Sequence, residues 1–338
     1  MKLGLGMSSK MLTPDNLRFA RQAGATHIVA HTPNAEQRIP GVNIAPWSYE
    51  ELCDLKKLIN DAGLELEAIE NFLPVFWSDV LLDGPRKVAQ MEDVKQIIRD
   101  CGRAGIPIFG YNFSLAGVWG RDHGPWARGE ADTVAYLDPE QPPIPLGMVW
   151  NQVVDPAAPV GVLAPVSQQQ LWERYTYFMN EIMPVAEEAG VVMALHPDDP
   201  PLPTLRGTAR LVYQPRIYQQ IFDQFPSHHN QAEFCLGTLS EMTEGDMLET
   251  VDTYTAQHKV AYIHFRNVRG KVPNYTEVFI DEGDTDMIAI LRVLHKNGYS
   301  GVLIPDHTPS MSCPAPWHAG MAFALGYMRA AMRIIEAE

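Results

Sequence analysis

The chain has 338 residues, of which 46% are apolar and 20% are charged, with a formal net charge of −15 at pH 7. This length and apolar content are those of a folded globular protein with a sizeable core, and they exclude a disordered chain. The negative charge argues against a non-specific nucleic-acid binder, which needs lysine and arginine to neutralise phosphates.

No apolar run approaches the roughly 18 to 20 residues that a membrane span requires. The beginning of the chain, MKLGLGMSSK, is too short in its apolar part for a secretory signal. We therefore expect a cytoplasmic protein with no membrane partner. The four cysteines are widely scattered, which predicts free thiols and no disulfide framework.

Strand and helix patterns alternate along the chain. Short apolar runs predict strands at 2–7, 26–32, 64–70, 107–113, 191–195, 233–238, 260–267 and 301–307. Cap residues and helical periodicity predict helices at 14–23, 48–62, 86–104, 167–189, 208–225, 246–258, 284–297 and from about 319 to the end. Ala-Gly pairs close several of these helices just before a strand, which indicates repeated right-handed crossovers and a parallel sheet.

Eight strands alternating with eight helices predict a TIM (β/α)8 barrel, with residues 1–338 as a single α/β domain. A doubly wound nucleotide-binding sheet has little support, because no GxGxxG turn follows the first strand.

Residues 114–166 interrupt the alternation of strands and helices after the fourth strand. They form a long, proline-rich connection that lacks clear periodicity. Such an insertion is usually a lid, a binding loop or an interface arm. Its tryptophans, Trp119, Trp126 and Trp150, would suit a lid or a homo-oligomer interface equally well.

Metal-binding residue types stand at the ends of the last four predicted strands. They are His196, Cys235, His264 and Asp306. Each residue alone has an ordinary structural explanation, as a buried histidine, a small buried thiol or a loop carboxylate. Strand ends converge at one mouth of a barrel, however, and two imidazoles, a thiolate and a carboxylate form a complete set of ligands for a divalent metal.

Several motifs together resemble the D-mannonate dehydratase family, metal-dependent lyases with a xylose-isomerase-like TIM barrel. The motifs are YNF at 111–113, HPDDPP at 196–201 with the LRG that follows, CLGT at 235–238, HFRNVRG at 264–270, GDTDM at 283–287 and PDH at 305–307. The resemblance implies that His196, Cys235, His264 and Asp306 hold the metal, usually Mn²⁺, and that His307 takes part in proton transfer.

The chemistry of such a lyase suits these residue types. Water leaves a sugar acid when the proton beside the carboxylate is abstracted and the neighbouring hydroxyl is expelled, which gives a 2-keto-3-deoxy acid. His307 is the candidate base, and a metal would stabilise the developing charge. Arg266 could pair with the substrate carboxylate, with Arg206 as a weaker candidate and Asn112 as a further substrate-binding residue.

The surroundings of the metal ligands carry two further expectations. Asp198 and Asp199 would orient the ring of His196 through its free nitrogen. The thiolate by itself favours the softer ions Zn²⁺ or Fe²⁺, whereas the family resemblance favours Mn²⁺.

The C-terminal segment departs from the family pattern. Ile304 stands where family members generally carry an arginine, and the stretch 307–323 has no tyrosine at the place of the family's catalytic one. Trp317 and His318 occupy roughly that place, so His318 could serve as the acid or base, or the segment could simply pack before the last helix.

Three functions remain open at this point. The first is a metal-dependent dehydratase, a hydro-lyase, acting on D-mannonate or a related aldonate. The second is a metal-dependent sugar isomerase or epimerase on the same kind of barrel. The third is a non-catalytic protein that binds metal or sugar acid, which the loss of the arginine and the tyrosine would favour.

Overall fold

The computed structural model describes residues 1–338 and contains a closed barrel of eight parallel strands. Around the barrel the strands follow the order β1-β16-β13-β12-β9-β4-β3-β2. Their bounds are β1 (Lys2–Ser8), β2 (His27–His31), β3 (Glu65–Glu70), β4 (Ile108–Tyr111), β9 (Val192–Leu195), β12 (Asn230–Cys235), β13 (Val260–His264) and β16 (Val302–Ile304). The expected TIM barrel is confirmed.

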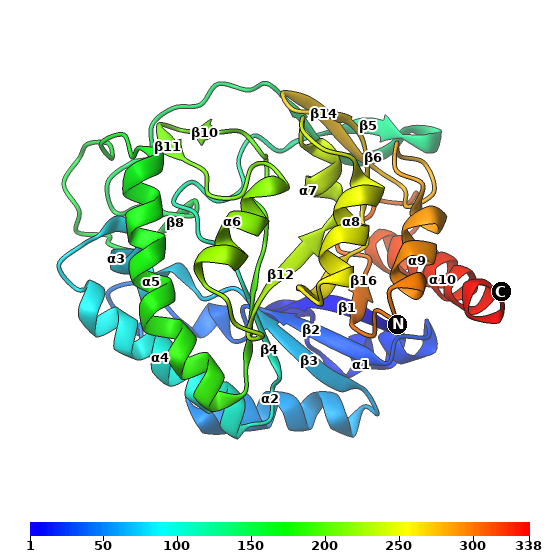
Figure 1. The fold of residues 1–338 in the computed structure, drawn as a ribbon, viewed down its shortest axis with the longest axis horizontal. Helices are drawn as coiled ribbons and strands as arrows, with labels where there is room; N and C mark the ends of the chain where they lie inside the picture. The colour runs from blue at the N-terminus through cyan, green and yellow to red at the C-terminus, as the bar shows by residue number, and fades with distance from the viewer.

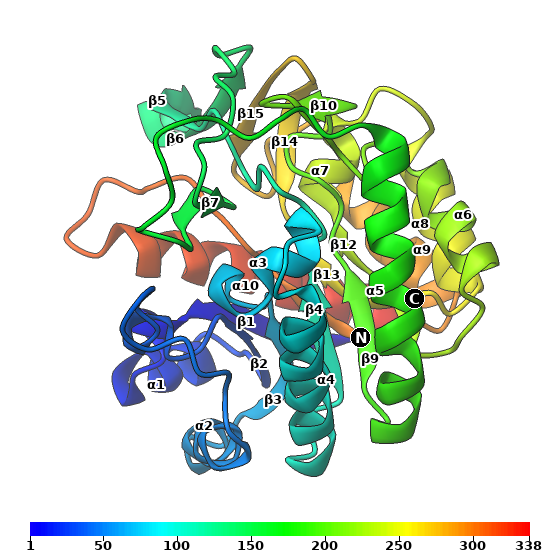
Figure 2. The same ribbon diagram turned by 90° about the vertical axis from the view of Figure 1, so that its left-hand side faces the viewer.

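Helices surround this barrel (Figures 1 and 2). They are α1 (Pro14–Gln22), α2 (Tyr49–Asp61), α3 (Pro74–Leu82), α4 (Lys87–Arg103), α5 (Gln168–Ala189), α6 (Arg216–Gln224), α7 (Leu236–Glu241), α8 (Met247–Ala256), α9 (Met287–Lys296) and α10 (Pro316–Ala337). Ser48 and Ser167 begin α2 and α5 with capping boxes, and Gly190 ends α5 at a φ of 68°. These are the start and stop signals that the sequence carries.

The structure differs from the sequence expectations at several elements. The helix expected over 208–225 begins only at Arg216, because β11 (Thr208–Ala209) pairs with β10 (Thr204–Leu205). The strand expected over 233–238 ends at Cys235, whose sulfur accepts a hydrogen bond from the Thr238 backbone at the start of α7. Helix α3 was not expected, since its apolar sequence has no amphipathic pattern.

Two apolar clusters form the core of the barrel. A cluster of 78 residues lies mainly between strands and helices, and a smaller one fills the inside of the barrel. The smaller cluster consists of Val29, Ala68, Ile108, Ala194, Ala261, Tyr262, Val302 and Ile304. Ile304 is thus a fully buried packing residue below the mouth of the barrel.

The insertion at 114–166 contains strands that the sequence did not predict. They are β5 (Asp122–Ala127), β6 (Ala131–Leu137), β7 (Met148–Val149) and β8 (Gln152–Val153). Strand β6 pairs with β15 (Asn274–Val278), which in turn pairs with β14 (Asn267–Lys271) in a four-stranded sheet, β14-β15-β6-β5. Figures 1 and 2 show this sheet above the carboxyl ends of the barrel strands, where it covers one side of the mouth. None of the helices has the length and apolar character needed to cross a membrane.

Candidate active site

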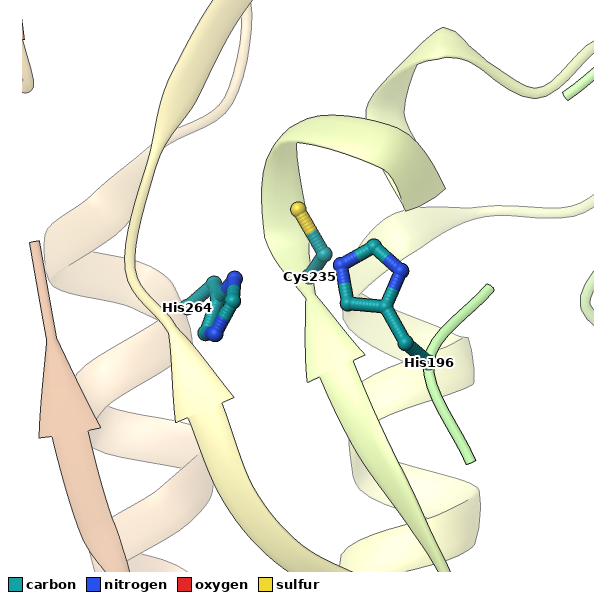
Figure 3. A group of neighbouring side chains, drawn as sticks. All are labelled: His196, Cys235 and His264. Carbon is teal, nitrogen blue, oxygen red and sulfur yellow. The ribbon is translucent and has the colours of Figure 1, made fainter. Parts of the chain in front are cut away.

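Three of the predicted metal ligands lie together at the carboxyl ends of neighbouring barrel strands. His196 follows β9, Cys235 ends β12 and His264 ends β13. One donor atom from each lies within 4.8 Å of the other two. Figure 3 shows the Cys235 sulfur beside the His196 ring, with the His264 ring facing them from the next strand. The site is deep, since Cys235 is fully buried and His264 is 2% exposed.

Cys235 has the environment of a thiolate. Burial alone would raise its pKa, but the charge of Arg266 and the neighbouring imidazoles of His196 and His264 hold that pKa well below the ordinary value of a thiol. Nη2 of Arg266 lies 3.2 Å from the sulfur. Because the thiolate is the form that binds metals, this side chain is prepared as a ligand.

The two ring nitrogens of His264 have different surroundings. Nε2 lies 3.0 Å from Oε2 of Glu70 and 2.9 Å from Oε1 of Glu233. Nδ1 has no hydrogen-bond partner and lies 3.4 Å from Oδ2 of Asp306. Carboxylates on one nitrogen of a histidine commonly orient the other toward a metal, so Nδ1 is the atom left for coordination.

Sequence reasoning missed Glu70 and Glu233. Both are buried in the wall of the barrel, at 4% and 0% exposure, next to apolar residues of β3 and β12. An acidic residue inside an apolar strand is a signal that could have identified them, because an isolated buried carboxylate is costly.

Asp306 lies beside the three-residue cluster, on the far side of His264 from Glu70. Its backbone has a φ of 57°, in the left-handed region that aspartate tolerates, at the turn that follows β16. Burial would raise its pKa, but the neighbouring His307 and His264 hold that pKa well below the usual range. Asp306 is therefore a charged carboxylate next to His264, outside the tight group of three.

Asp198 and Asp199 do not orient His196, contrary to the sequence expectation. Asp198 pairs with Arg210, whose Nε lies 3.1 Å from Oδ1. Asp199 accepts hydrogen bonds from Arg266 at 2.9 Å and from the Tyr275 hydroxyl at 2.8 Å. Both carboxylates instead pair with buried arginines, because a charge-assisted hydrogen bond to arginine is stronger than a hydrogen bond to a neutral imidazole ring.

The His196 ring faces its own loop instead. Its Nδ1 lies 2.5 Å from the carbonyl oxygen of Pro197. Because Nδ1 makes this contact, Nε2 is the ring nitrogen of His196 that is available to the cluster with Cys235 and His264.

The two arginines proposed for the substrate carboxylate are both engaged elsewhere. Arg266 is 2% exposed and is surrounded by protein carboxylates, although it contributes to the cavity wall. Arg206 lies away from the cavity. Its guanidinium donates to the Pro142 carbonyl at 2.9 Å and to Asn151 at 2.8 Å, and it stacks on the Trp119 ring at 3.9 Å. The structure therefore corrects the prediction for Arg206, which anchors the insertion.

His307 lies where the sequence reasoning placed a base. Its Nδ1 is 3.1 Å from Oε2 of Glu277, and its Nε2 is 3.4 Å from Oδ1 of Asp306. Burial would raise the pKa of Glu277, but the charges of Arg266, His307 and Arg121 hold that pKa far below its ordinary value. The Glu277 carboxylate, on β15, was not anticipated and keeps His307 at the edge of the cavity.

His318 does not reach the site. Its Nε2 lies 2.9 Å from Oδ1 of Asn16, and its ring packs edge-on against Phe19 and Trp317. Trp317 lines the cavity, but His318 does not. The side chain of His318 at the start of α10 is directed to α1, so the prediction that it supplies an acid or base is corrected.

His196 and His264 of the cluster form part of the wall of a cavity of about 320 Å³ at the mouth of the barrel. The other lining residues come from six strand ends, the insertion and the C-terminal loop: Gly6, Ser8, Met11, His31, Glu70, Asn71, Asn112, Val118, Arg121, Trp150, Asp199, Arg266, Asp306, His307 and Trp317. Oδ1 of Asn112 is buried in this wall without a partner, which leaves it free to accept a hydrogen bond.

His31 is a cavity residue that sequence reasoning did not identify. Its Nδ1 lies 3.0 Å from Oε1 of Glu70, which fixes the ring at the end of β2. Nε2 lies against Gly6, where a Cβ atom would approach it to 2.6 Å. A glycine is therefore required at position 6 to leave room for this ring.

The comparison with protein families is decisive. Residues 9–136 and 158–330 match the family D-mannonate dehydratase (UxuA). The chain belongs to this family. It is accordingly a sugar-acid dehydratase, a carbon–oxygen hydro-lyase. The unmatched stretch between the two segments lies within the insertion.

Individual relatives agree with this membership in the D-mannonate dehydratase family. The mannonate dehydratase of Streptococcus suis (strain 05ZYH33) is 30% identical over 275 residues, which cover 77% of this chain and 74% of the relative. Mannonate dehydratase 2 of Halalkalibacterium halodurans is also 30% identical, covering 77% and 79%. The crystal structure of mannonate dehydratase from Streptococcus suis serotype 2 superposes with a TM-score of 0.83 at 26% identity, over 100% of this chain and 94% of that one.

More distant structures share the fold alone. D-psicose 3-epimerase from Clostridium cellulolyticum H10 has a TM-score of 0.62 at 12% identity, covering 98% of this chain and 99% of that one. The mannonate dehydratase family thus uses the xylose-isomerase-like barrel that the sequence motifs indicated.

Proposed function

We propose that this protein is a metal-dependent dehydratase that removes water from D-mannonate or a closely related aldonate and releases a 2-keto-3-deoxy acid. The observation that carries the proposal is the thiolate and imidazole cluster in a cavity that also holds a fixed histidine, His307. Membership in the D-mannonate dehydratase family supports the same reaction class.

The donor set fits a divalent metal. His196, Cys235 and His264 would hold the ion, with Asp306 as the adjacent carboxylate. When bound, the metal would supply Lewis-acid stabilisation of negative charge on the substrate's carboxylate side. Family resemblance favours Mn²⁺, whereas the sulfur ligand favours Fe²⁺ or Zn²⁺, so metal reconstitution has to compare all three.

His307 is the proposed base for the proton beside the carboxylate. Its Nδ1 is held by Glu277, so Nε2 is the nitrogen that would receive the proton. The carboxylates of Glu277 and Asp306 on either side would stabilise the imidazolium that results. Protein carboxylates therefore both orient this ring and favour its charged form after the transfer.

His31 is the proposed proton donor to the departing hydroxyl. Burial would lower its pKa, but the charge of Glu70 and the hydrogen bond with it raise that pKa above the ordinary value. A protonated ring at the cavity wall can deliver a proton from Nε2, the nitrogen that Glu70 does not hold. This role replaces the one that the sequence suggested for His318.

The insertion would act as a wall and lid of the reaction chamber. It contributes Val118, Arg121 and Trp150 to the cavity, and an enclosed chamber protects an enol intermediate from bulk water. A homo-oligomer formed through other parts of this insertion stays a prediction.

The test begins with the metal content of the purified protein. It continues with a keto-acid assay of the Mn²⁺-, Fe²⁺- and Zn²⁺-loaded forms against a panel of aldonates that includes D-mannonate. We expect about one equivalent of metal and a 2-keto-3-deoxy acid from one aldonate. His307→Asn should lower kcat by about 10² to 10⁴-fold. Metal without product from any aldonate would contradict the proposal.

The same incubations, carried out in deuterated solvent, distinguish a dehydratase from an epimerase. If the loaded protein exchanges the C2 proton of an aldonate with solvent deuterium and inverts that carbon without loss of water, the barrel carries out epimerisation. Exchange accompanied by keto-acid formation supports the dehydratase.

A further inference from the structure

We propose that Arg121, supplied by the insertion, binds the substrate's carboxylate and makes the site selective for acid over neutral sugars. The inference rests on the proposed function, because it assigns the recognition of the acid group at the same site. It replaces the assignment to Arg266 and Arg206 that the sequence suggested.

Only two strong cations line the cavity. They are Arg121 and Arg266, and no lysine lines it. The wall also carries the carboxylates of Glu70, Asp199 and Asp306, in addition to the nearby Cys235 thiolate. A carboxylate ligand entering this acidic chamber therefore needs a cation that is not already neutralised.

Arg266 cannot fill this role, because Nη1 and Nη2 of its guanidinium are bound to protein acceptors and Nε, which has no hydrogen-bond partner, is buried. Nε lies 3.4 Å from Asp306, Nη1 pairs with Glu277, and Nη2 lies 2.9 Å from Asp199. The buried Glu241 is also within 3.5 Å of Nη2. Turning Arg266 toward a substrate would leave buried carboxylates unpaired, which is strongly unfavourable.

Arg121 has free donors. Its Nη2 donates to Oε1 of Glu277 at 2.9 Å, while Nε and Nη1 make no hydrogen bond within the chain. One third of the side chain, 33%, is accessible, and the residue lines the cavity. The free edge of a guanidinium matches the two oxygens of a carboxylate, which accept two parallel hydrogen bonds from it.

The position of Arg121 also suits the reaction. Its Nη2 lies 3.3 Å from Nδ1 of His307, so the carboxylate-binding group and the proposed base are neighbours. In an aldonate, the carbon that loses its proton is bonded directly to the carboxylate. A carboxylate held by Arg121 therefore brings that carbon to the side of the cavity where His307 lies.

The small sheet above the barrel explains how Arg121 is held. The residue precedes β5, and its partner Glu277 belongs to β15 of the same four-stranded sheet. Gly120, with a φ of 74°, lies so close to Tyr136 and Pro139 that a side chain there would collide with both. The turn before β5 is thus closely packed, and the ion pair with Glu277 orients the guanidinium of Arg121.

The experiment measures binding of a matched pair of unreactive ligands to the Mn²⁺-loaded protein by calorimetry. The acid is the 3-deoxy analogue of D-mannonate, which has no hydroxyl to lose, and the neutral ligand is the corresponding 3-deoxy alditol. We expect Arg121→Met to weaken acid binding by about 10- to 100-fold and alditol binding by less than about threefold. Arg121→Lys should recover part of the acid affinity.

The control is Arg269→Met, which removes a surface arginine of β14 that pairs with Glu282. It should leave both affinities unchanged. Equal losses for acid and alditol in Arg121→Met, or an unchanged acid affinity, would overturn the proposal. Metal content and the thermal midpoint of each variant identify a folding defect. If Arg121→Met has such a defect, Arg121→Lys is the deciding variant. Relative to the wild type, it must then lose affinity for the acid but not for the alditol.

This design separates the two proposals. If the wild-type protein prefers the acid ligand and Arg121→Met abolishes the preference, Arg121 has the assigned role even when D-mannonate gives no keto acid. In that outcome only the proposed dehydration would fail.

Discussion

Nη2 of Arg266 lies 3.2 Å from the sulfur of Cys235 at the bottom of the cavity, and both side chains are almost completely buried. The contact gives a role to the arginine that stands two residues after His264, a proposed metal ligand. It supplies the positive charge that keeps a buried thiol ionised, which burial alone would prevent. Arg266 is thus a positioning and electrostatic residue of the proposed metal site.

Loss of a cluster ligand should abolish metal binding. Cys235→Ser replaces the thiolate by a neutral hydroxyl, and His196→Ala removes an imidazole, so each variant keeps at most two of the three central ligands. We expect less than about 10% of the wild-type metal content after dialysis, measured by mass spectrometry of the metal. His295→Ala, on the exposed face of α9, is the matched control and should keep its metal. Full metal retention in Cys235→Ser would place the ion elsewhere.

Metal affinity should increase with pH up to about 9. Burial disfavours the charged form of His196, but the charge of Glu233 and the hydrogen bond with Cys235 raise its pKa to about 9 in the metal-free protein. Below that pH the ring carries a proton that the metal has to displace. The apparent affinity therefore falls as the pH decreases below 9, by up to about tenfold per pH unit for each ligand ring that carries a proton.

Calorimetry in buffers of different ionisation enthalpy measures this proton directly. At pH 7 we expect proton release on metal binding from His196 and from His264, whose pKa is raised, despite burial, by the carboxylates of Asp306 and Glu70. Cys235 should release none, because its thiol is already ionised. A metal affinity that stays constant between pH 6 and about 9 would contradict the raised pKa of His196.

His31 and His318 should behave differently when substituted. His318→Ala should change kcat/KM by less than about threefold, because its ring contacts α1 and lies outside the cavity. His31→Asn should lower kcat by about 10²-fold or more if His31 donates the proton to the leaving hydroxyl. A 3-deoxy-3-fluoro aldonate tests this role, since fluoride leaves without protonation. The defect of His31→Asn should be much smaller with that substrate, whereas a purely structural defect would be the same with both.

Substitution of Arg206 should affect stability more than substrate binding. Arg206→Met removes a charge-assisted contact to Asn151, a hydrogen bond to Pro142 and the stacking on Trp119, which together tie the insertion to the barrel. We expect a loss of about 2 kcal/mol in the free energy of unfolding and a lower thermal midpoint. KM should change little at saturating metal. A large rise in KM with an unchanged thermal midpoint would return Arg206 to substrate binding.

Local sequence patterns were sufficient to predict the barrel and three clustered ligands. Periodicity and Ala-Gly stops mark alternating strands and helices, and the barrel topology then forces the ends of consecutive strands together. His196, Cys235 and His264 could be grouped for that reason, since each stands at the end of its strand. Position along a strand is a local property, which a sequence carries directly.

The partners of the charged residues were decided only by the tertiary structure. Glu277 reaches His307 and Arg121 because β15 pairs with β6, from a segment more than 100 residues earlier in the chain. Likewise, Arg206 turns to the insertion, and Asp199 turns to Arg266. Buried charges pair with whichever opposite charge the fold brings within reach, and that choice depends on long-range contacts that local sequence patterns do not encode. The sequence by itself therefore determined the barrel and the strand-end cluster, while the tertiary structure decided which arginine is left free for a ligand.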